Sequence, residues 1–268
     1  MRSGSEIRSR GSVNIHPSAI VHPDAELGEG VEIGPYVIIA ATVKIGDNTI
    51  VGPRATIEGN TTLGRENEIF TGAVIGSPTQ DKKYDGGTNA LRIGDRNKIR
   101  EYVTINPGTT RETETVIGDG NLLMAYAHVA HDCVIKNNAI LANNGTLAGH
   151  VIVEDGAIIG GLSAVHQFVK IGKLAIVGGC SKVVKDIPPY MMADGHPARV
   201  RGINTVGLER AGYSDEDKLQ IKQAFKIIFK SQLVIKKAIA QIEGELKDSP
   251  TLRVLLEFLK NSERGISR

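Results

Sequence analysis

Aliphatic residues recur at every sixth position over most of this chain. Steps of six from Ile15 to Val183 give 29 positions, of which 26 hold Ile, Leu or Val. These residue types number 70 of 268, so chance would place about 8 of them there. A helix would spread such residues around its axis, whereas an extended chain that bends every six residues directs each one inward. Three such hexads close one triangular coil, so the repeat predicts a mainly β protein, a parallel β-helix.

Composition agrees with a narrow, stacked core and excludes several classes of protein. The chain has 31 glycines, no tryptophan and only 4% aromatic residues, and thin layers leave no room for large rings. A net charge of +2 argues against a nucleic-acid partner. No apolar run approaches the roughly 20 residues that span a bilayer, and residues 1–12 have no apolar core, so we expect no secretory signal there. Cys133 and Cys180 form no metal-binding or disulfide motif. We expect reduced thiols, no stable membrane insertion and a cytoplasmic location.

Interruptions of the repeat define the expected domains. Residues 1–12, rich in Arg, Ser and Gly, look like an added tail outside the fold. The β-helix should span residues 13–190, with loops at 76–92 and 106–116, after which the repeat resumes in phase. Beyond Pro188-Pro189 the apolar spacing becomes helical, and Ser214 and Ser249 fit helix N-caps. We therefore expect a C-terminal helical domain over residues 191–268.

Stacking of the coils should gather polar residues that lie far apart in the sequence. Residues 18 apart occupy the same point of successive coils. The segments AYAHVAHDC, LAGH and AVHQF therefore meet at one corner. One column there contains His131, Gly149 and Gln167, and its neighbour contains Asp132, His150 and Phe168; His166 stacks over Ala148.

Three uses of this corner are open on the residues alone. A histidine oriented by a carboxylate, such as His131 with Asp132, could deprotonate a hydroxyl or amine that attacks a thioester. Three imidazoles could instead hold zinc. The β-helical carbonic anhydrases resemble this chain in their hexads, but they space two histidines five apart with a third two coils earlier, and no pair here does so. We expect no metal. A purely structural prism would leave the polar corner and both loops unexplained.

Longer segments point to one family. The hexads resemble those of the left-handed parallel β-helix acyltransferases. The chain also contains IGSPTQDKKY, IGDRNKIRE, NLLMAYAHVAHDC, ILANNGTLAGHV, IIGGLSAVHQF, VGGCSKVVKDIPPY and INTVGLERAGY. Over residues 13–268 these segments resemble the UDP-N-acetylglucosamine acyltransferase family.

The resemblance implies a reaction and an assembly. A (R)-3-hydroxyacyl chain would pass from acyl carrier protein to the 3-hydroxyl of UDP-N-acetylglucosamine, in the first step of lipid A (lipopolysaccharide) biosynthesis. The transfer would be direct, without a cofactor or a covalent enzyme intermediate. The resemblance also implies a left-handed homotrimer with its sites between subunits.

The resemblance also assigns roles to individual residues. His131 would be the general base and the N–H of Gly149 would stabilise the oxyanion. Residues matching contacts to the nucleotide sugar or the pantetheine arm are His128, His150, His166 and Gln167. Asp81 and Lys83 would lie near the glucosamine ring, and Asn204 and Arg210 would hold the nucleotide. Gly179 would leave the acyl groove open to a long chain of about fourteen carbons. Candidates to meet the acidic carrier protein are Arg199, Arg201 and Lys83.

Some positions depart from the family pattern. Asn106 and Pro107 stand where many relatives have histidine and arginine, and Val206 and Ala211 replace polar or charged residues. Some relatives acylate a 3-amino sugar, so the acceptor atom stays open. The rival within the same pathway is the later N-acyltransferase, which usually has an additional N-terminal domain. The rival from another class is a metal-binding or structural hexapeptide protein.

Overall fold

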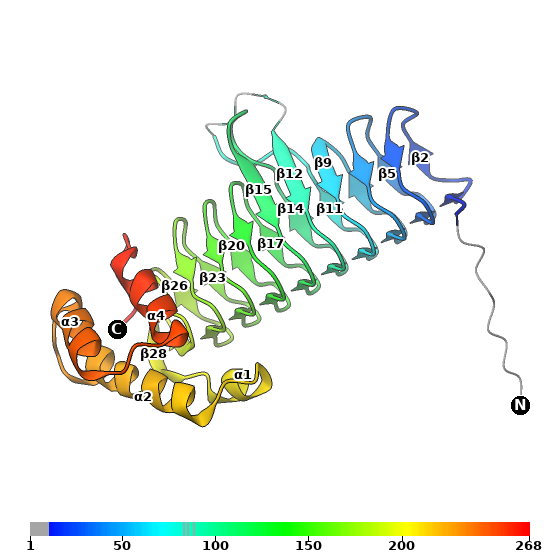
Figure 1. Cartoon of the computed structure of the whole chain (residues 1–268). Helices are drawn as coiled ribbons and strands as arrows, with labels where there is room; N and C mark the ends of the chain where they lie inside the picture. Colours follow the sequence, from blue (N-terminus) through cyan, green and yellow to red (C-terminus); the bar gives the residue numbers. More distant parts are fainter. Residues whose placement is uncertain (1–10, 83, 85, 88) are drawn as a thin grey trace, which may run out of the picture.

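Three flat parallel sheets form the body of the molecule. The computed structural model describes residues 11–268 except 83, 85 and 88. Each coil contributes one strand to each sheet in turn, and paired residues in regular coils lie 18 apart, as in Asn14 and Glu32. Figure 1 shows the coils stacked in chain order.

The strands are short, and most consist of two residues. The first sheet contains β1 (Asn14–Ile15), β4 (Glu32–Ile33), β7 (Ile50–Val51), β10 (Glu68–Ile69), β13 (Lys98–Ile99), β16 (Leu122–Leu123), β19 (Ile140–Leu141), β22 (Ile158–Ile159), β25 (Ile176–Val177), β27 (Met191–Gly195) and β28 (Ala198–Ile203). The second contains β2 (Ile20–Val21), β5 (Ile38–Ile39), β8 (Thr56–Ile57), β11 (Val74–Ile75), β14 (Thr104–Ile105), β17 (His128–Val129), β20 (Thr146–Leu147), β23 (Ala164–Val165) and β26 (Lys182–Val183). The third contains β3 (Glu26–Leu27), β6 (Lys44–Ile45), β9 (Asn60–Leu63), β12 (Ala90–Ile93), β15 (Glu114–Ile117), β18 (Val134–Ile135), β21 (Ile152–Val153) and β24 (Lys170–Ile171).

The repeated aliphatic residues fill the interior, as their spacing predicts. The second residue of a two-residue strand points inward, and residues such as Ile57, Leu123 and Ile159 are fully buried. Ile15 differs, with 42% of its surface exposed, because it lies in the terminal coil with a neighbour on one side only. Burial of this continuous stack is the main contribution to the stability of the β-helix.

Both loops leave the β-helix at the same corner. The first loop (residues 76–89) follows β11 and the second loop (residues 106–113) follows β14, and both lead from the second sheet into the third. The strands that follow, β12 and β15, are four residues long and pair along their whole length. We expected loops up to residues 92 and 116, but the structure has strand at residues 90–92 and 114–116. The strand register continues across both loops, as the pairing of Ile93 with Leu63 and with Ile117 shows.

A β-hairpin separates the coils from four helices. Strand β27 continues the first sheet beside β25, and β28 runs antiparallel to it, so residues 191–195 and 198–203 are strand rather than helix. Four helices follow, α1 (Thr205–Arg210), α2 (Asp215–Lys230), α3 (Ile235–Glu245) and α4 (Pro250–Lys260). The Ser214 and Ser249 hydroxyls accept the N–H groups of Asp217 and Leu252, as N-caps do.

The helices cover the C-terminal end of the β-helix, opposite the N-terminal coils (Figure 1). Their buried side chains join the apolar core of the coils, among them Ile221, Ile228, Ile242 and Leu255. None of the helices in the described part of the chain is long and apolar enough to cross a membrane.

Candidate active site

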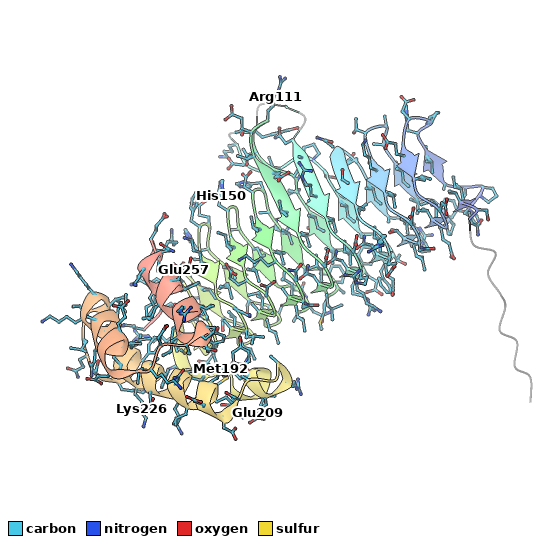
Figure 2. The ribbon with its side chains drawn as sticks, in the orientation of Figure 1. Arg111, His150, Met192, Glu209, Lys226 and Glu257 are labelled. Carbon is cyan, nitrogen blue, oxygen red and sulfur yellow. The ribbon has the colours of Figure 1, made fainter. Side chains whose placement is uncertain are left out.

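The polar corner lies where the second sheet turns into the third. His131 and Asp132 follow β17, and Gly149 and His150 occupy the equivalent turn after β20. Asp132 and His150 have left-handed backbone conformations, with φ of 58° and 60°, which allow the tight turn between strands. Both loops emerge from this corner, and Figure 2 shows His150 on the same edge of the β-helix as the loop that carries Arg111.

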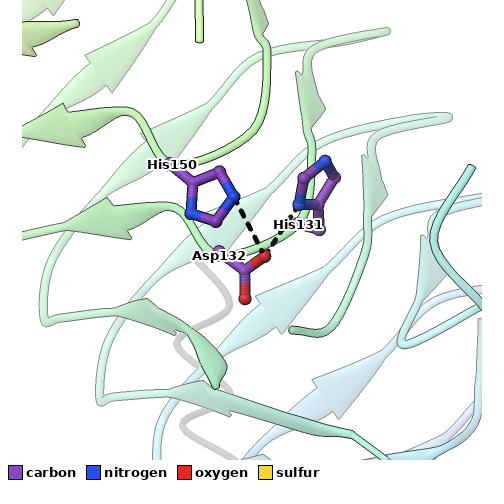
Figure 3. Close-up of side chains that lie close together, drawn as sticks. All are labelled: His131, Asp132 and His150. Atoms are coloured by element: carbon purple, nitrogen blue, oxygen red, sulfur yellow. Dashed lines mark hydrogen bonds and ion pairs between the residues drawn. The ribbon is translucent and has the colours of Figure 1, made fainter. Parts of the chain in front are cut away.

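His131 lies between two carboxylates. Its Nδ1 is 2.8 Å from Oδ2 of Asp132, the next residue, as Figure 3 shows. Its Nε2 is 3.4 Å from Oδ2 of Asp81, which comes from the first loop. Both His131 and Asp132 are 9% exposed, so the ring has few alternative positions. An imidazole held by a carboxylate at Nδ1 can act as a base through Nε2.

The Asp132 carboxylate is stabilised in its charged form. Its Oδ2 accepts the Thr109 hydroxyl at 2.6 Å, and its Oδ1 accepts the Thr109 N–H at 3.1 Å. Burial raises the pKa of Asp132, but hydrogen bonds from Thr109, Thr113 and His131 outweigh this effect and leave the pKa lowered. Asp132 is therefore an anion that orients His131 at neutral pH.

The neighbouring histidines have different surroundings. Burial, with a smaller effect of His131, lowers the pKa of His128, whose Nδ1 is 2.7 Å from the Thr104 hydroxyl. His128 is consequently neutral near pH 7. The His150 ring stacks on Phe168 with centroids 4.5 Å apart and meets His131 edge-on at 5.2 Å. Its Nε2 lies 3.6 Å from Asp132 Oδ2 (Figure 3).

Gly149 lies directly against the His131 ring. A Cβ at this position would be 2.3 Å from Cε1 and 2.5 Å from Nε2 of His131, a separation that no side chain tolerates. Within the described residues, the Gly149 N–H donates no backbone hydrogen bond, while its carbonyl accepts from Phe168. The Gly149 main chain therefore lies close to His131, and a backbone N–H close to a base is suited to stabilise an oxyanion formed there.

His166 and Gln167 occupy the next coil along the same corner. Both are exposed, and His166 Nδ1 lies 3.1 Å from the Gln167 carbonyl. Lys83 lies outside the residues that the structure describes.

The other predicted site residues lie elsewhere on the chain. Gly179 follows β25, at the corner that leads from the first sheet to the second. Asn204 caps α1, where its Oδ1 accepts the Gly207 N–H and its Nδ2 donates to the Leu174 carbonyl. Arg210 is exposed at the end of α1. Gly179, Asn204 and Arg210 thus lie outside the polar corner of the same chain. The residues that one chain brings together there are His128, His131, Asp132, Asp81, Gly149 and His150.

Several contacts at the site were not expected from the sequence. Thr109 reaches both His131 and Asp132 from the second loop, and Thr104 contacts His128. Asn106, one of the departures from the family pattern, donates to the Ser77 carbonyl at 3.1 Å and so ties the two loops together. The pairing of Thr104 with His128 in adjacent strands could have been found by continuing the strand register through the loop. Thr109 has no such periodic signal.

The corner also contains potential metal ligands. Ligand atoms of His131, Asp132 and His150 all lie within 4.8 Å of one another. Within the described chain, however, the two Asp132 oxygens already accept hydrogen bonds from Thr109. Asp132 also accepts from His131 Nδ1 at 2.8 Å, while His150 stays at ion-pair distance, 3.6 Å from Asp132 Oδ2.

Comparison with known proteins identifies relatives over almost the whole chain. Residues 186–267 match a family model described as UDP-N-acetylglucosamine O-acyltransferase, domain 2, and residues 114–149 match the bacterial transferase hexapeptide repeat. The acyl-[acyl-carrier-protein]–UDP-N-acetylglucosamine O-acyltransferase of Synechocystis is 48% identical over 94% of this chain and 91% of its own length. Its namesake in Herminiimonas arsenicoxydans is 48% identical, over 95% and 99% of the two chains.

Solved structures agree. LpxA from Acinetobacter baumannii superposes with a TM-score of 0.92 at 43% identity, covering 95% of this chain and 99% of its own. LpxA from Bacteroides fragilis, a UDP-N-acetylglucosamine acyltransferase, gives 0.93 at 43% identity, covering 95% and 100%. The predicted left-handed β-helix with a C-terminal helical domain is confirmed. The chain belongs to the family of acyl-[acyl-carrier-protein]–UDP-N-acetylglucosamine O-acyltransferases.

Proposed function

We propose that this acyltransferase moves a (R)-3-hydroxyacyl chain from acyl carrier protein to the 3-hydroxyl of UDP-N-acetylglucosamine, the first step of lipid A biosynthesis. The donor and acceptor are those named for its relatives. The observation that carries the mechanism is His131, held at Nδ1 by Asp132 with Gly149 against its other side.

The reaction is a direct transfer. His131 Nε2 takes the proton of the sugar hydroxyl while its oxygen attacks the thioester carbonyl carbon. The Gly149 N–H stabilises the oxyanion of the tetrahedral intermediate. When the carbon–sulfur bond breaks, the thiolate of the carrier's pantetheine arm leaves and takes the proton back from the His131 imidazolium. Asp132 balances the charge of that imidazolium throughout.

The environment of Cys133 argues against a covalent acyl-cysteine. This thiol is only two residues from His131, but it is fully buried and its Sγ donates to the Ala148 carbonyl at 3.1 Å. Burial raises the pKa of Cys133 to about 12. A buried, protonated thiol is a poor nucleophile. No cofactor is required, because the acyl group only exchanges sulfur for oxygen.

Substrate contacts follow the same corner. We assign His128, His150, His166 and Gln167 to the nucleotide sugar and the pantetheine arm, and Asp81 with Lys83 to the glucosamine ring. Asn204 would help hold the nucleotide by fixing the start of α1, which ends at Arg210. The small Gly179 leaves room for a long acyl chain.

The separation of these residues favours a site shared between copies. Gly179 and Arg210 lie away from His131 within one chain, so another copy would have to supply them. The outer face of the first sheet carries an apolar stripe of Leu122, Ile140, Ile158 and Ile176 from four adjacent strands. Such a stripe suits burial between identical subunits, and we infer a homotrimer.

The remaining assignments concern partners and location. Arg199 and Arg201 project from β28 as candidate contacts for the acidic carrier protein, although Arg201 also pairs with Asp194 at 2.6 Å. The net charge of +2 is close to neutral, which argues against a nucleic-acid partner. The expected reduced thiols favour the cytoplasm.

The test is acyl transfer from hydroxyacyl carrier protein to UDP-N-acetylglucosamine and, in parallel, to its 3-amino analogue. Loss of a general base should slow the His131→Ala protein by about a hundredfold or more. His16→Ala, a change at an exposed histidine in the first coil, is the matched control and should remain active. An inactive wild type with both acceptors would refute the reaction, whereas full activity of His131→Ala would refute only the base.

A further inference from the structure

We propose that Thr109 is a positioning residue of this site, whose hydroxyl and N–H hold Asp132 so that His131 keeps its proton on Nδ1 and its lone pair on Nε2. The inference rests on the proposed acyl transfer. Thr109 comes from the second loop, which has no hexapeptide pattern.

Thr109 is fixed where it can play this role. Its side chain is 7% exposed, and the preceding residue anchors the loop to the first one. The Gly108 N–H donates to the Ala90 carbonyl at 3.1 Å, and the Gly108 carbonyl accepts from Asn89 at 2.8 Å. The backbone immediately before Thr109 is therefore tied to β12 and to the first loop.

The hydroxyl contacts both members of the His131–Asp132 pair. Thr109 Oγ1 is 2.6 Å from Asp132 Oδ2 and 2.7 Å from His131 Nδ1. The Thr109 N–H binds the other carboxylate oxygen at 3.1 Å. One residue thus fixes both oxygens of the group that orients the base.

Counting protons then selects the tautomer. A hydroxyl has one hydrogen to donate, and an ionised carboxylate can only accept, so the Thr109 hydrogen goes to Asp132. Thr109 can then meet His131 only as an acceptor, which requires a proton on Nδ1. The 2.8 Å contact between Nδ1 and Asp132 requires the same proton. Both contacts leave Nε2 as the basic nitrogen, beside Gly149.

Of the other charged groups around His131, Asp81 favours the opposite tautomer, but its contact with Nε2 is 3.4 Å, longer than the 2.8 Å contact of Asp132 with Nδ1. Asp81 faces Nε2 from the first loop, and His150 meets the ring edge-on from the next coil. His128 lies on β17 of the same coil and is kept neutral by burial. Only the Asp132 and Thr109 contacts involve Nδ1 among the described residues.

The decisive variant is Thr109→Val, which keeps the shape and the backbone N–H but removes the hydroxyl. We expect kcat to fall about ten- to a hundredfold with little change in KM, because a hydrogen bond to a charged group is lost away from the substrate. Nitrogen-15 NMR should show His131 protonated at Nδ1 in the wild type and a mixture of tautomers in the variant.

Two controls separate the hydroxyl from the loop. Thr109→Ser retains the hydroxyl and should keep the wild-type kcat, KM and tautomer. Thr62→Val makes the same change at an exposed position on β9 and should also resemble the wild type. If Thr109→Val does not fold, the tautomer of the wild type and the activity of Thr109→Ser still test whether the hydroxyl of Thr109 positions His131.

Three results would overturn the proposal: wild-type behaviour of Thr109→Val, a loss in Thr109→Ser as large as in Thr109→Val, or a wild-type proton on Nε2. The NMR measurement needs no acyl transfer. A wild type without transferase activity would therefore refute the proposed function, while the tautomer would still test the role of Thr109.

Discussion

At the scale of single residues, environment distinguishes histidines that share one corner. His131 is buried between Asp132 and Asp81, His128 is half-buried against Thr104, and His166 is exposed. Only His131 has a carboxylate on each ring nitrogen among these three. General-base chemistry needs an imidazole oriented by an anion, which explains why we assign the role to this residue.

Gly149 offers a direct test of the ring position. A Cβ there would overlap the His131 ring, so Gly149→Ala should displace the base and lower kcat about a hundredfold, the usual cost of misplacing a reacting group by about 1 Å. Gly244→Ala on α3 is the matched control, since its Cβ would meet nothing within 4 Å. That control should stay active and gain about 0.5–1 kcal/mol of stability. Transfer rates and thermal unfolding measure both effects. Unchanged activity of Gly149→Ala would show that the ring is not confined there.

Metal removal should leave the reaction intact. The Asp132 oxygens already have hydrogen-bond donors, and the proposed steps use only proton transfer. We therefore expect the same rate before and after dialysis against a chelator, with no stoichiometric zinc by elemental analysis. Loss of activity that added zinc restores would instead favour a metal-dependent reaction at His131, Asp132 and His150.

At the scale of structural elements, a buried polar ladder joins successive coils. Asn67, Asn97 and Asn121 are almost fully buried inside one corner. The Asn97 Oδ1 accepts the backbone and side-chain N–H groups of Asn121, and its own N–H groups donate to Asn67 Oδ1. The ladder satisfies backbone groups where a turn leaves them without strand partners.

Breaking the ladder should destabilise the fold more than an equivalent surface change. Asn97→Ala removes the acceptor of the Asn121 N–H, and an unsatisfied buried donor costs about 1–3 kcal/mol. Asn137→Ala is the control, because water can replace the exposed Asn137 acceptor. Chemical denaturation should show a lower midpoint for Asn97→Ala than for Asn137→Ala. Equal midpoints would mean that the ladder contributes no net stability.

At the scale of the whole molecule, the flat sheets leave surfaces that one chain does not cover. The stripe of Leu122, Ile140, Ile158 and Ile176 runs along the first sheet near its C-terminal end. Flat, rigid faces of this kind can pack on identical copies with little loss of conformational entropy. Because Gly179 and Arg210 lie away from His131 in one chain, we expect the same packing to complete the active site.

Charge on this stripe should prevent assembly. Ile158→Glu would place a carboxylate in the proposed interface, so we expect light scattering to detect monomers where the wild type is a trimer. Activity should fall with the trimer, because each site would lose the residues of its neighbour. Ile20→Glu, at a position 67% exposed on the first coil, should assemble normally. A trimeric Ile158→Glu protein or a monomeric wild type would contradict the assignment.

The sequence by itself determined the coils and the stacking of His131, Asp132, Gly149 and His150. A strict six-residue period converts distance along the chain into position in space, so residues 18 apart must stack. The placement of Asp81 and Thr109 was decided by the tertiary structure, because loops have no period and are held by contacts between distant segments. The same holds for β27 and β28, which become strands by pairing with each other and with β25 rather than through a repeat.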